Sequence, residues 1–401
     1  MNREELNSVA EVLALIDGGV EALPAVSLSL ETAVGCVLAE DVFADADQPA
    51  FDRSAVDGFA VAEGNVAGTY DIAGEILPGD SAFQPPAAGR ALRISTGSAV
   101  PPGSAIVMIE DAEVSGVRVT LKRAPETRFI RRRGSSVQAG SRLLTKGSRI
   151  GAGEVAVLAS VGIAAIRAIP RPRVLHVTTG REIVPGEASP RPGQIRDTNG
   201  PLIHALLRGA EAEPLARCHV DESVESLASA VKRSGAFDLL LVSGGSSAGL
   251  YDRTSPALEA LGFSILSRGV NSRPGKPLIV ARRGRQWAFG LPGNPVSHFA
   301  AFHVFVVRAL RRLAGRTAPS GVWAHLGADL PGSPGPHETF WPARAESSPA
   351  GLTVSPLPWL DSGDLKALIG VNALIRLAAN ARPVAGHAVE VILCGFDFPF
   401  A

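Results

Sequence analysis

Two carboxylates lie among small and aromatic residues in the segment Phe51-Asp-Arg-Ser-Ala-Val-Asp-Gly-Phe-Ala60. A carboxylate between apolar neighbours, such as Asp57, needs a hydrogen-bond donor or a cation. Asp57-Gly58 is also a favoured turn pair. Taken alone, the segment fits a tight turn as well as a functional loop.

Four loops in the second half of the chain fall where strands are expected to end: Thr178-Thr-Gly-Arg-Glu182, Ser243-Gly-Gly-Ser-Ser-Ala-Gly249, Arg273-Pro-Gly-Lys-Pro277 and Leu291-Pro-Gly-Asn-Pro-Val-Ser297. Backbone N–H groups of a glycine-rich turn that leads into a helix can cradle phosphate. Tight strand-to-helix turns would explain the same residues. So would simple helix capping, with Asn294 as N-cap and Pro295 at the first helical position.

Two cations flank a rigid turn in the third of these loops. Arg273 and Lys276 could neutralise an anionic ligand, although a solvated lysine needs no function. The loop is not a P-loop, because that pattern requires Ser or Thr after the lysine and one fewer residue between Gly269 and Gly275.

Carboxylates accompany these anion-binding loops, namely Glu182, Asp197, Asp221 and Asp252. Acids beside bound phosphate make sense mainly with a hard cation between them, and Mg²⁺ bridged by carboxylates and phosphates fits that need. For Asp197 there is an alternative, since Asp197-Thr198-Asn199 could be an N-cap cluster before the helix expected from Pro201.

Two other patterns carry less chemistry. Residues 151–156 formally match a dinucleotide fingerprint but have no strand directly before them, so they indicate a glycine-rich helix start. His298 and His303 are five residues apart on an expected buried helix, without a metalloprotease pattern. They are therefore interpreted as packing histidines and not as zinc ligands.

The bulk composition bounds the function. With 401 residues several domains are expected, and 39 basic against 39 acidic residues argue against a general nucleic-acid binder. Cys36, Cys218 and Cys394 lack metal spacing and indicate reduced thiols in a cytoplasmic protein. An acidic N-terminal segment that leads into a helix capped by Ser8 and Glu11 argues against export. No apolar run reaches the length of a membrane span.

The rhythm of the elements changes along the chain. In the early part of the chain, short apolar runs separated by turns predict strands at residues 34–39, 91–95, 105–109 and 117–121, and residues from about 45 to 136 are expected to form a β-rich domain. A helix is expected at residues 154–161 and a strand at residues 163–169, before a hinge at Pro170-Arg-Pro172.

From Arg173 strands and helices alternate, with buried strands at residues 174–177 and 239–242 and a long buried helix at residues 296–313. Shorter helices are expected near residues 201–208, 222–232 and 255–261. The alternation predicts a doubly wound α/β sheet that binds ligands at the carboxyl ends of its strands. Past about Arg316, strands at residues 352–355, 373–377 and 389–393 predict a small C-terminal β-barrel or sandwich.

The ordered set of motifs resembles the molybdopterin molybdenumtransferase family, which includes the bacterial molybdenum insertase and the E domain of gephyrin. The resemblance covers nearly the whole chain. Its motifs are residues 51–58, Arg93-Ile-Ser-Thr-Gly97 with Val100-Pro101, Ile130-Arg-Arg-Arg-Gly134, Thr179-Gly-x-Glu182, Gly193-Gln-Ile-x-Asp-Thr-Asn199, Ser243-Gly-Gly245, Tyr251-Asp252, Pro274-Gly-Lys-Pro277 and Leu291-Pro-Gly-Asn-Pro-Val-Ser297.

The resemblance implies a multidomain α/β fold and an elongated homodimer. It places an interrupted N-terminal domain at residues 1–44 and 137–169, a β-rich second domain at 45–136, a three-layer molybdopterin-binding domain at 170–316 and a C-terminal β-barrel at 317–401. The implied reaction is Mg²⁺-assisted insertion of molybdate into adenylylated molybdopterin, with release of AMP. The active site would lie between the α/β domain of one subunit and the second domain of its partner, with transient contacts to molybdoenzymes possible.

The resemblance also implies roles for individual residues. The pterin and its phosphates would be held by Ser243, Gly244, Gly245, Pro292, Gly293 and Asn294, and Lys276 with Arg273 would neutralise pyrophosphate and molybdate. The candidates for Mg²⁺ or acid–base chemistry are Glu182, Asp221 and Asp252. At the molybdate end the candidates are Asp57, Thr96 and Ser362.

The chain departs from the family pattern at several positions. Ser135-Ser136 replaces an acidic pair, Pro342 follows Phe340-Trp341 where an arginine is usual, Leu250 replaces a glutamate and Arg273 replaces a lysine. These departures leave a second hypothesis open, a non-catalytic carrier or sensor of molybdopterin or of the finished cofactor. A third hypothesis is a partner-binding scaffold, but no extended linker accompanies the domain.

Overall fold

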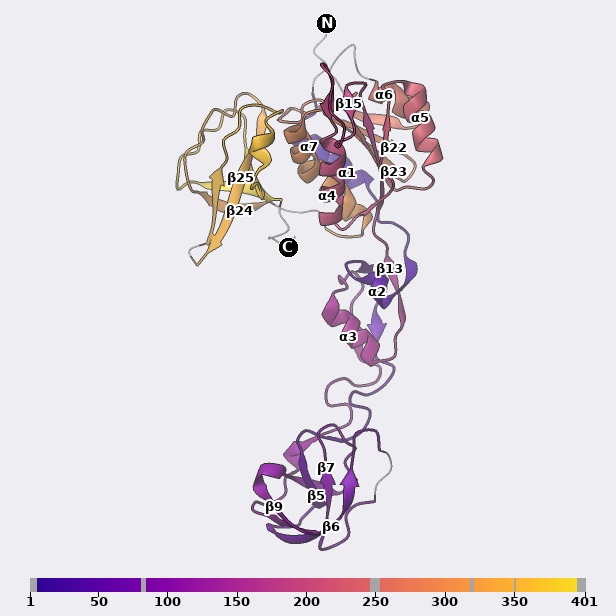
Figure 1. Ribbon diagram of the computed structural model, residues 1–401, viewed down its shortest axis with the longest axis vertical. Helices are drawn as coiled ribbons and strands as arrows, with labels where there is room; N and C mark the ends of the chain where they lie inside the picture. Colours follow the sequence, from indigo (N-terminus) through magenta and orange to yellow (C-terminus); the bar gives the residue numbers. More distant parts are fainter. Residues whose placement is uncertain (1–5, 81–83, 246–252, 318–320, 350, 395–401) are drawn as a thin grey trace. The chain divides into compact units, whose positions relative to one another are not determined.

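The structure is a computed structural model that describes residues 6–80, 84–245, 253–317, 321–349 and 351–394. It divides into two compact units (Figure 1). The large unit contains Met1–Val26, Gly35–Val37 and Ala168–Ala401, and the small unit contains Ser27–Val34 and Leu38–Arg167.

The small unit is built around a six-stranded sheet in the order β8-β5-β7-β6-β10-β9. Its strands are β5 (Gly58–Ala62), β6 (Gly68–Ile76), β7 (Arg90–Ile94), β8 (Ser104–Met108), β9 (Ala112–Ser115) and β10 (Arg118–Leu121). Strands expected near residues 91–95, 105–109 and 117–121 are therefore confirmed. Buried apolar residues such as Phe59, Val61 and Val107 form the core of this sheet.

Shorter elements complete this part of the chain. They are α2 (Leu30–Ala33), β3 (Val42–Phe43) with β12 (Arg142–Leu144), β4 (Arg53–Ser54) with β11 (Ile130–Arg131), α3 (Ala152–Ser160), η1 (Ile109–Asp111) and η2 (Thr127–Phe129). A three-stranded sheet has the order β1-β13-β2, from β1 (Val26–Ser29), β13 (Ala165–Ile169) and β2 (Val37–Leu38).

Two strands are shorter than their sequences predict, and a glycine explains each. The strand expected at residues 34–39 begins only at Val37, because Gly35 has φ +84° and turns the chain after α2. The strand expected from Ile163 begins at Ala165, just after Gly162, which has φ +77°. Glycine adopts these left-handed conformations without the steric cost that other residues bear.

The large unit contains the predicted α/β sheet, in the order β17-β14-β19-β23-β22-β20. The strands are β14 (Arg173–Thr179), β17 (Glu213–Pro214), β18 (Cys218–Val220), β19 (Leu239–Ser243), β20 (Ser264–Arg268), β22 (Ile279–Arg283) and β23 (Gln286–Leu291). β14, β19 and β23 run parallel, whereas β22 is antiparallel to both β23 and β20. β20 consequently points the same way as the parallel strands. The loops that follow β14, β19, β20 and β23 therefore begin at the same edge of the sheet.

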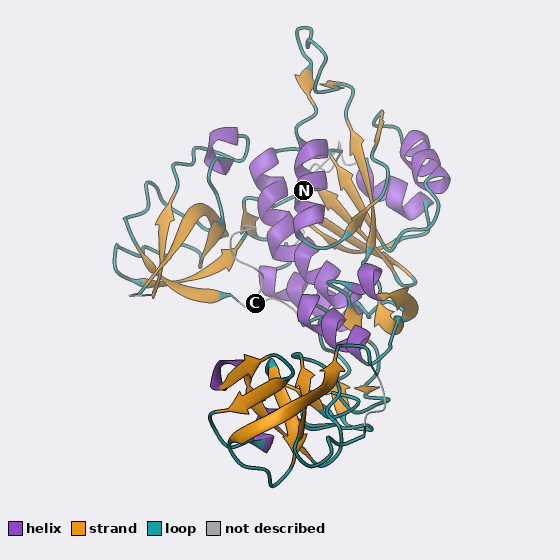
Figure 2. Cartoon of the chain, turned by 60° about the horizontal axis from the view of Figure 1, so that its bottom comes forward, coloured by secondary structure: helices purple, strands orange, loops and turns teal. Residues whose placement is uncertain are grey.

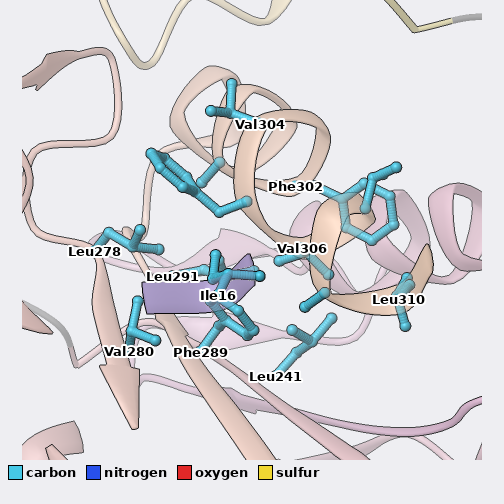
Figure 3. Packing of buried hydrophobic residues seen from close by; sticks show 14 of the residues in the cluster. Ile16, Leu241, Leu278, Val280, Phe289, Leu291, Phe302, Val304, Val306 and Leu310 are labelled. Carbon is cyan, nitrogen blue, oxygen red and sulfur yellow. The ribbon is translucent and has the colours of Figure 1, made fainter. Parts of the chain in front are cut away.

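Helices cover both faces of this sheet. One face carries α1 (Val9–Gly19), α4 (Asn199–Gly209), α7 (Pro295–Ala301), the π-helical η3 (Phe302–Val306) and α8 (Val307–Leu313). The other face carries α5 (Val224–Arg233) and α6 (Thr254–Ala260), as Figure 1 shows. β19 supplies both cores, because Leu239 and Leu241 point to one face and Leu240 and Val242 to the other. Figure 3 shows Leu241, Phe289 and Leu291 packed under the π-helical segment.

Three local predictions are confirmed in this unit. α1 begins with a capping box between Ser8 and Glu11. The helix expected at residues 296–313 is one run of α7, η3 and α8, buried along residues 296–307. α5 begins at Val224, later than expected, because Ser223 is its N-cap.

The C-terminal region is a closed five-stranded barrel, which confirms that prediction. Its strands are β24 (Val322–Leu326), β25 (Glu338–Ser348), β26 (Gly351–Pro356), β27 (Ala373–Leu377) and β28 (Ala388–Leu393), with η4 (Leu365–Leu368) nearby (Figure 2). Pairing of β25 with β27 closes the ring. The short β21 (Ser272–Arg273) also pairs with β25, so the basic loop is attached to the barrel.

Candidate functional site

The first part of the site is the glycine turn at the end of β19. Gly244 donates to the carbonyl of Leu291, 3.3 Å away, and Thr179 Oγ1 donates to the carbonyl of Ser243. A Cβ on Gly244 would lie 2.5 Å from the Thr179 carbonyl oxygen, and Gly244 has φ +91°. Both facts require glycine there. The turns after β14, β19 and β23 therefore lie side by side, as predicted.

The second part is the loop before α7. Asn294 occupies the N-cap position and Pro295 the first helical position, as predicted, but the Asn294 side chain does not cap the helix. Its Nδ2 instead donates to Ser362 Oγ at 2.6 Å, and the Val296 amide donates to the Ser362 carbonyl. Asn199 Nδ2 donates to the Gly293 carbonyl at 2.7 Å from the opposite side. The loop is therefore fixed by α4 and by the barrel.

The third part is the basic loop, in which the two cations differ. The Arg273 guanidinium lies 4.8 Å from the centre of the Trp359 ring, in cation–π geometry, and donates to the Ser333 carbonyl. The side chain of the exposed Lys276 has no ion pair or hydrogen bond with any described residue. Arg273 thus helps to build the site, and Lys276 offers an uncompensated charge.

The loop before α7 and the basic loop line a pocket of about 490 Å³ within the large unit, whereas Ser243, Gly244 and Gly245 are not among its lining residues. It brings together six residues predicted from the sequence: Arg273, Lys276, Pro292, Gly293, Asn294 and Ser362. Trp359, Asp361 and His337 also line it, and the sequence analysis missed them. The proximity of Trp359 and Asp361 to Ser362 in the chain was the one signal that could have pointed to them.

Ser243 is buried at the inner end of the site between two histidines. Its Oγ lies 2.7 Å from Nε2 of His176 and 2.7 Å from Nε2 of His298. Burial lowers the pKa of His176 to about 3 and that of His298 to about 4, so both rings are neutral near pH 7. The expectation that His298 is a packing residue is therefore incomplete, because it also holds a polar contact at the site. His176 was missed, since a histidine inside an apolar strand gives no distinct signal.

The predicted acidic residues are in different situations. Glu182 is exposed, and its carboxylate folds over Gly180. Asp221 is exposed and accepts from the Ser223 amide at 2.8 Å and from Ser226 Oγ at 3.0 Å. The Ser223 side chain first, and then these two hydrogen bonds, lower the pKa of Asp221, which they tie to the start of α5. Asp252 lies outside the described residues.

Asp197 caps a helix, as its alternative interpretation predicted, because its Oδ1 accepts from the Gly200 amide at 2.8 Å. Within the described part of the chain no three His, Cys, Asp or Glu side chains form a group that could hold a metal ion. The magnesium site therefore stays a prediction.

Asp57 and Thr96 are brought together in the small unit. Oδ1 of Asp57 accepts from the Thr96 amide at 2.7 Å and from Thr96 Oγ1 at 3.0 Å. These bonds, with a smaller contribution from the Arg93 charge, lower the pKa of Asp57. Gly58 permits the arrangement, because a Cβ there would lie 1.9 Å from the Val107 carbonyl oxygen. Asp57 is exposed, so its apolar neighbours in the sequence do not bury the carboxylate, and the two bonds from Thr96 fix its position.

The triple arginine contacts the same segment. Arg132 pairs with Asp52 at 2.6 Å, and Arg133 pairs with Asp47 at 2.7 Å. The serines that follow use their backbone, since Ser135 donates to the Arg132 carbonyl and Ser136 to the Gln48 carbonyl. The segment at residues 51–58 is therefore held by charged partners as well as by a turn.

Comparisons with known proteins agree with this arrangement. Residues 7–162 match the model of the MoeA N-terminal region (domain I and II), and residues 176–312 match that of a probable molybdopterin binding domain. A molybdopterin molybdenumtransferase from Staphylococcus epidermidis is 31% identical over 381 residues, covering 92% of this chain and 91% of the relative. Another from Staphylococcus aureus is 30% identical over 405 residues, covering 97% and 96%.

The chain belongs to the molybdopterin molybdenumtransferase family. This family places it in molybdenum cofactor biosynthesis as a transferase. A crystal structure of a molybdopterin biosynthesis MoeA protein from Pyrococcus horikoshii is similar, with a TM-score of 0.78 and 26% identity, covering 98% of this chain and 100% of that chain.

Among the described helices, none has the length and apolar character needed to cross a bilayer.

Proposed function

We propose that the protein inserts molybdate into adenylylated molybdopterin in an Mg²⁺-dependent reaction that releases AMP. One observation supports this most directly. Lys276, the Arg273–Trp359 pair and the Pro292–Asn294 turn share one pocket at the carboxyl edge of the sheet. Such an edge is where doubly wound α/β sheets bind ligands.

In this proposal the neighbouring turns bind the substrate. Backbone amides of Gly245, Gly293 and Asn294 hold the pterin phosphates, as N–H groups in glycine turns do for other anions, while the Gly244 amide stays bonded to the Leu291 carbonyl. Lys276 neutralises the pyrophosphate or the incoming molybdate, because no described acid compensates its charge. Arg273 is held against Trp359 and Ser333, so it shapes the pocket and adds positive potential.

Carboxylates supply the remaining chemistry. Oxygen ligands suit Mg²⁺, and Glu182, Asp221 and Asp252 are the acids proposed to hold it. Bound magnesium would offset the repulsion between phosphate and molybdate. Asp221 can take part only with the lone pairs that its bonds to Ser223 and Ser226 leave free.

Asp57 and Thr96 are proposed to serve the molybdate end of an active site shared in a homodimer. Both hydrogen bonds from Thr96 end on Oδ1 of Asp57, which leaves Oδ2 without a partner among the described residues. That oxygen could accept a proton or a cation. We also propose a cytoplasmic location and transient contacts with molybdoenzymes.

A second candidate keeps the ligand and omits the chemistry. It is favoured by Ser135-Ser136, which carry no charge next to the triple arginine, and by Pro342, which stands in β25 opposite Leu374. Such a protein would carry or sense molybdopterin or the finished cofactor.

The test is a turnover assay of the purified protein. It is incubated with adenylylated molybdopterin and molybdate, with and without Mg²⁺, and AMP and molybdenum cofactor are measured. Magnesium-dependent release of both products supports the transferase. Tight binding of the pterin without AMP release would support the carrier instead.

A further inference from the structure

The contacts of Ser243 with two histidines form a directional hydrogen-bond chain. Nδ1 of His298 lies 3.3 Å from the Asn294 carbonyl oxygen, which can only accept. A neutral imidazole has one N–H, so Nδ1 carries the proton and Nε2 of His298 is an acceptor. The Ser243 hydroxyl then donates to His298, and its oxygen accepts from Nε2–H of His176. The proton positions are assigned from these partners.

An independent observation agrees with this assignment. The hydrogen-bond chain requires that Nδ1 of His176 carry no proton, and this buried atom has no hydrogen-bond partner among the described residues. The opposite tautomer would place a buried N–H at Nδ1 without an acceptor. The chain therefore runs from His176 through Ser243 and His298 to the Asn294 carbonyl.

Each member comes from a different element. His176 lies in the middle of β14, Ser243 ends β19, His298 lies in α7, and Asn294 precedes α7. Ser243 thus lies at the turn at residues 243–245, and the Asn294 end of the hydrogen-bond chain lies at the turn at residues 292–294. All three side chains are at most 4% exposed, so water does not compete for these bonds.

We infer that His298 is a positioning residue, which holds the glycine turn after β19 in register with the Pro292–Asn294 turn of the pocket through Ser243. The hydrogen-bond chain stands on geometry alone, while its role in substrate binding rests on the proposed function. Without the His298 side chain, the two turns would keep the backbone hydrogen bond from Gly244 to Leu291. They would lose the side-chain connection from Ser243 to the Asn294 carbonyl.

The polypeptide contains a matched control residue, His303, in the same helical run. His303 is also buried, and burial lowers its pKa to about 3, yet neither of its ring nitrogens has a partner among the described residues. It contacts the rings of Phe299 and Phe302. His303→Leu therefore removes a buried imidazole without touching a hydrogen bond.

The first experiment compares His298→Leu, His298→Gln and His303→Leu by hydrogen–deuterium exchange without ligand. His298→Leu should speed exchange in peptides covering residues 243–245 and 292–298, by about two- to tenfold, the range that one neutral hydrogen bond spans. His298→Gln keeps an acceptor facing Ser243 and should restore slow exchange, while His303→Leu should change nothing there. Unchanged exchange in His298→Leu, or equal acceleration in His303→Leu, would overturn the inference.

The second experiment measures kinetics with adenylylated molybdopterin. A positioning role predicts that His298→Leu raises KM by a similar two- to tenfold factor and changes kcat by less than twofold. An effect on kcat alone would contradict it. If the wild-type protein shows no turnover, the proposed function fails, but the exchange experiment still decides the hydrogen-bond chain. If His298→Leu does not fold, Ser243→Ala interrupts the same chain with a smaller change of volume and should give the same accelerated exchange.

Discussion

Asn294 Nδ2 donates a hydrogen bond of 2.6 Å to Ser362 Oγ, which joins the turn before α7 to the C-terminal barrel. The Val296 amide adds a second bond to the Ser362 carbonyl, and β21 pairs with β25 close by. The pocket wall is therefore made by two structures that lie far apart in the sequence. The barrel contributes directly to the site and is not merely an appendage.

Ser362→Ala should weaken substrate binding without unfolding the protein. The change removes the acceptor for Asn294 but keeps the backbone bond to Val296, so the loss corresponds to about one neutral hydrogen bond, roughly 0.5–1.5 kcal/mol. KM for adenylylated molybdopterin should rise about two- to tenfold in steady-state assays. Ser347→Ala, an exposed serine of β25, is the control. Equal KM values for the two variants would remove Ser362 from the site.

Lys276→Ala should abolish turnover and leave the melting temperature unchanged. The lysine side chain is exposed and makes no ion pair or hydrogen bond with a described residue, so its removal costs little stability. Turnover is measured by AMP release and folding by thermal unfolding. The control is Lys366→Ala, an exposed lysine of the barrel helix η4. Full activity in Lys276→Ala would mean that the pocket is not the reaction site.

Gly58→Ala should destabilise the small unit strongly. A Cβ there would lie 1.9 Å from the Val107 carbonyl oxygen, which belongs to the paired strand β8 and cannot rotate away. Overpacking of this kind costs about 1–3 kcal/mol or more. Gly153→Ala is the matched control, because nothing lies within 4 Å of its Cβ position in α3. Gly153→Ala should raise the free energy of unfolding, measured in urea, by up to about 1 kcal/mol.

Stability should fall as the pH falls from about 6.5 towards 4. Burial lowers the pKa of His176 to about 3, of His298 to about 4 and of His303 to about 3. In this window the unfolded chain binds protons that the folded chain does not, so acid favours unfolding by up to about 1.4 kcal/mol per pH unit for each histidine.

Urea unfolding at pH 7 and pH 5 measures this dependence. His303→Leu should reduce the slope of unfolding free energy against pH, because it removes one buried neutral histidine without a hydrogen bond. A slope equal to that of the wild type would mean that His303 is protonated in the folded state.

Sequence patterns predicted the elements that depend on local chemistry. The alternation of apolar runs placed the strands and helices of the large unit, and Ser8, Asn294 and Pro295 marked helix starts correctly. Glycine turns and basic residues also identified most of the pocket. These features could be predicted because a cap, a turn or a buried strand requires particular residue types within a few positions of the chain.

Contacts between distant segments could not be predicted from the sequence in the same way. Nothing near Arg273 in the sequence indicates that Trp359 covers it, and nothing near Asn294 indicates that its side chain turns to Ser362 rather than to its own helix. His176 lies in an apolar strand, and its partner Ser243 is 67 residues away. Only the structure therefore distinguishes Arg273, which packs on Trp359, from Lys276, whose side chain is exposed.

Asp221→Asn should raise the magnesium requirement of the reaction while preserving α5. Asparagine caps helices as well as aspartate does, so the bond to the Ser223 amide survives and the melting temperature should stay close to that of the wild type. Losing the charge should raise the Mg²⁺ concentration for half-maximal AMP release about tenfold or more, as for Glu182→Gln and Asp252→Asn. Asp197→Asn is the matched control, because Asp197 caps α4 in the same manner through the Gly200 amide. If Asp221→Asn and Asp197→Asn gave the same magnesium titration as the wild type, Asp221 would serve the helix alone.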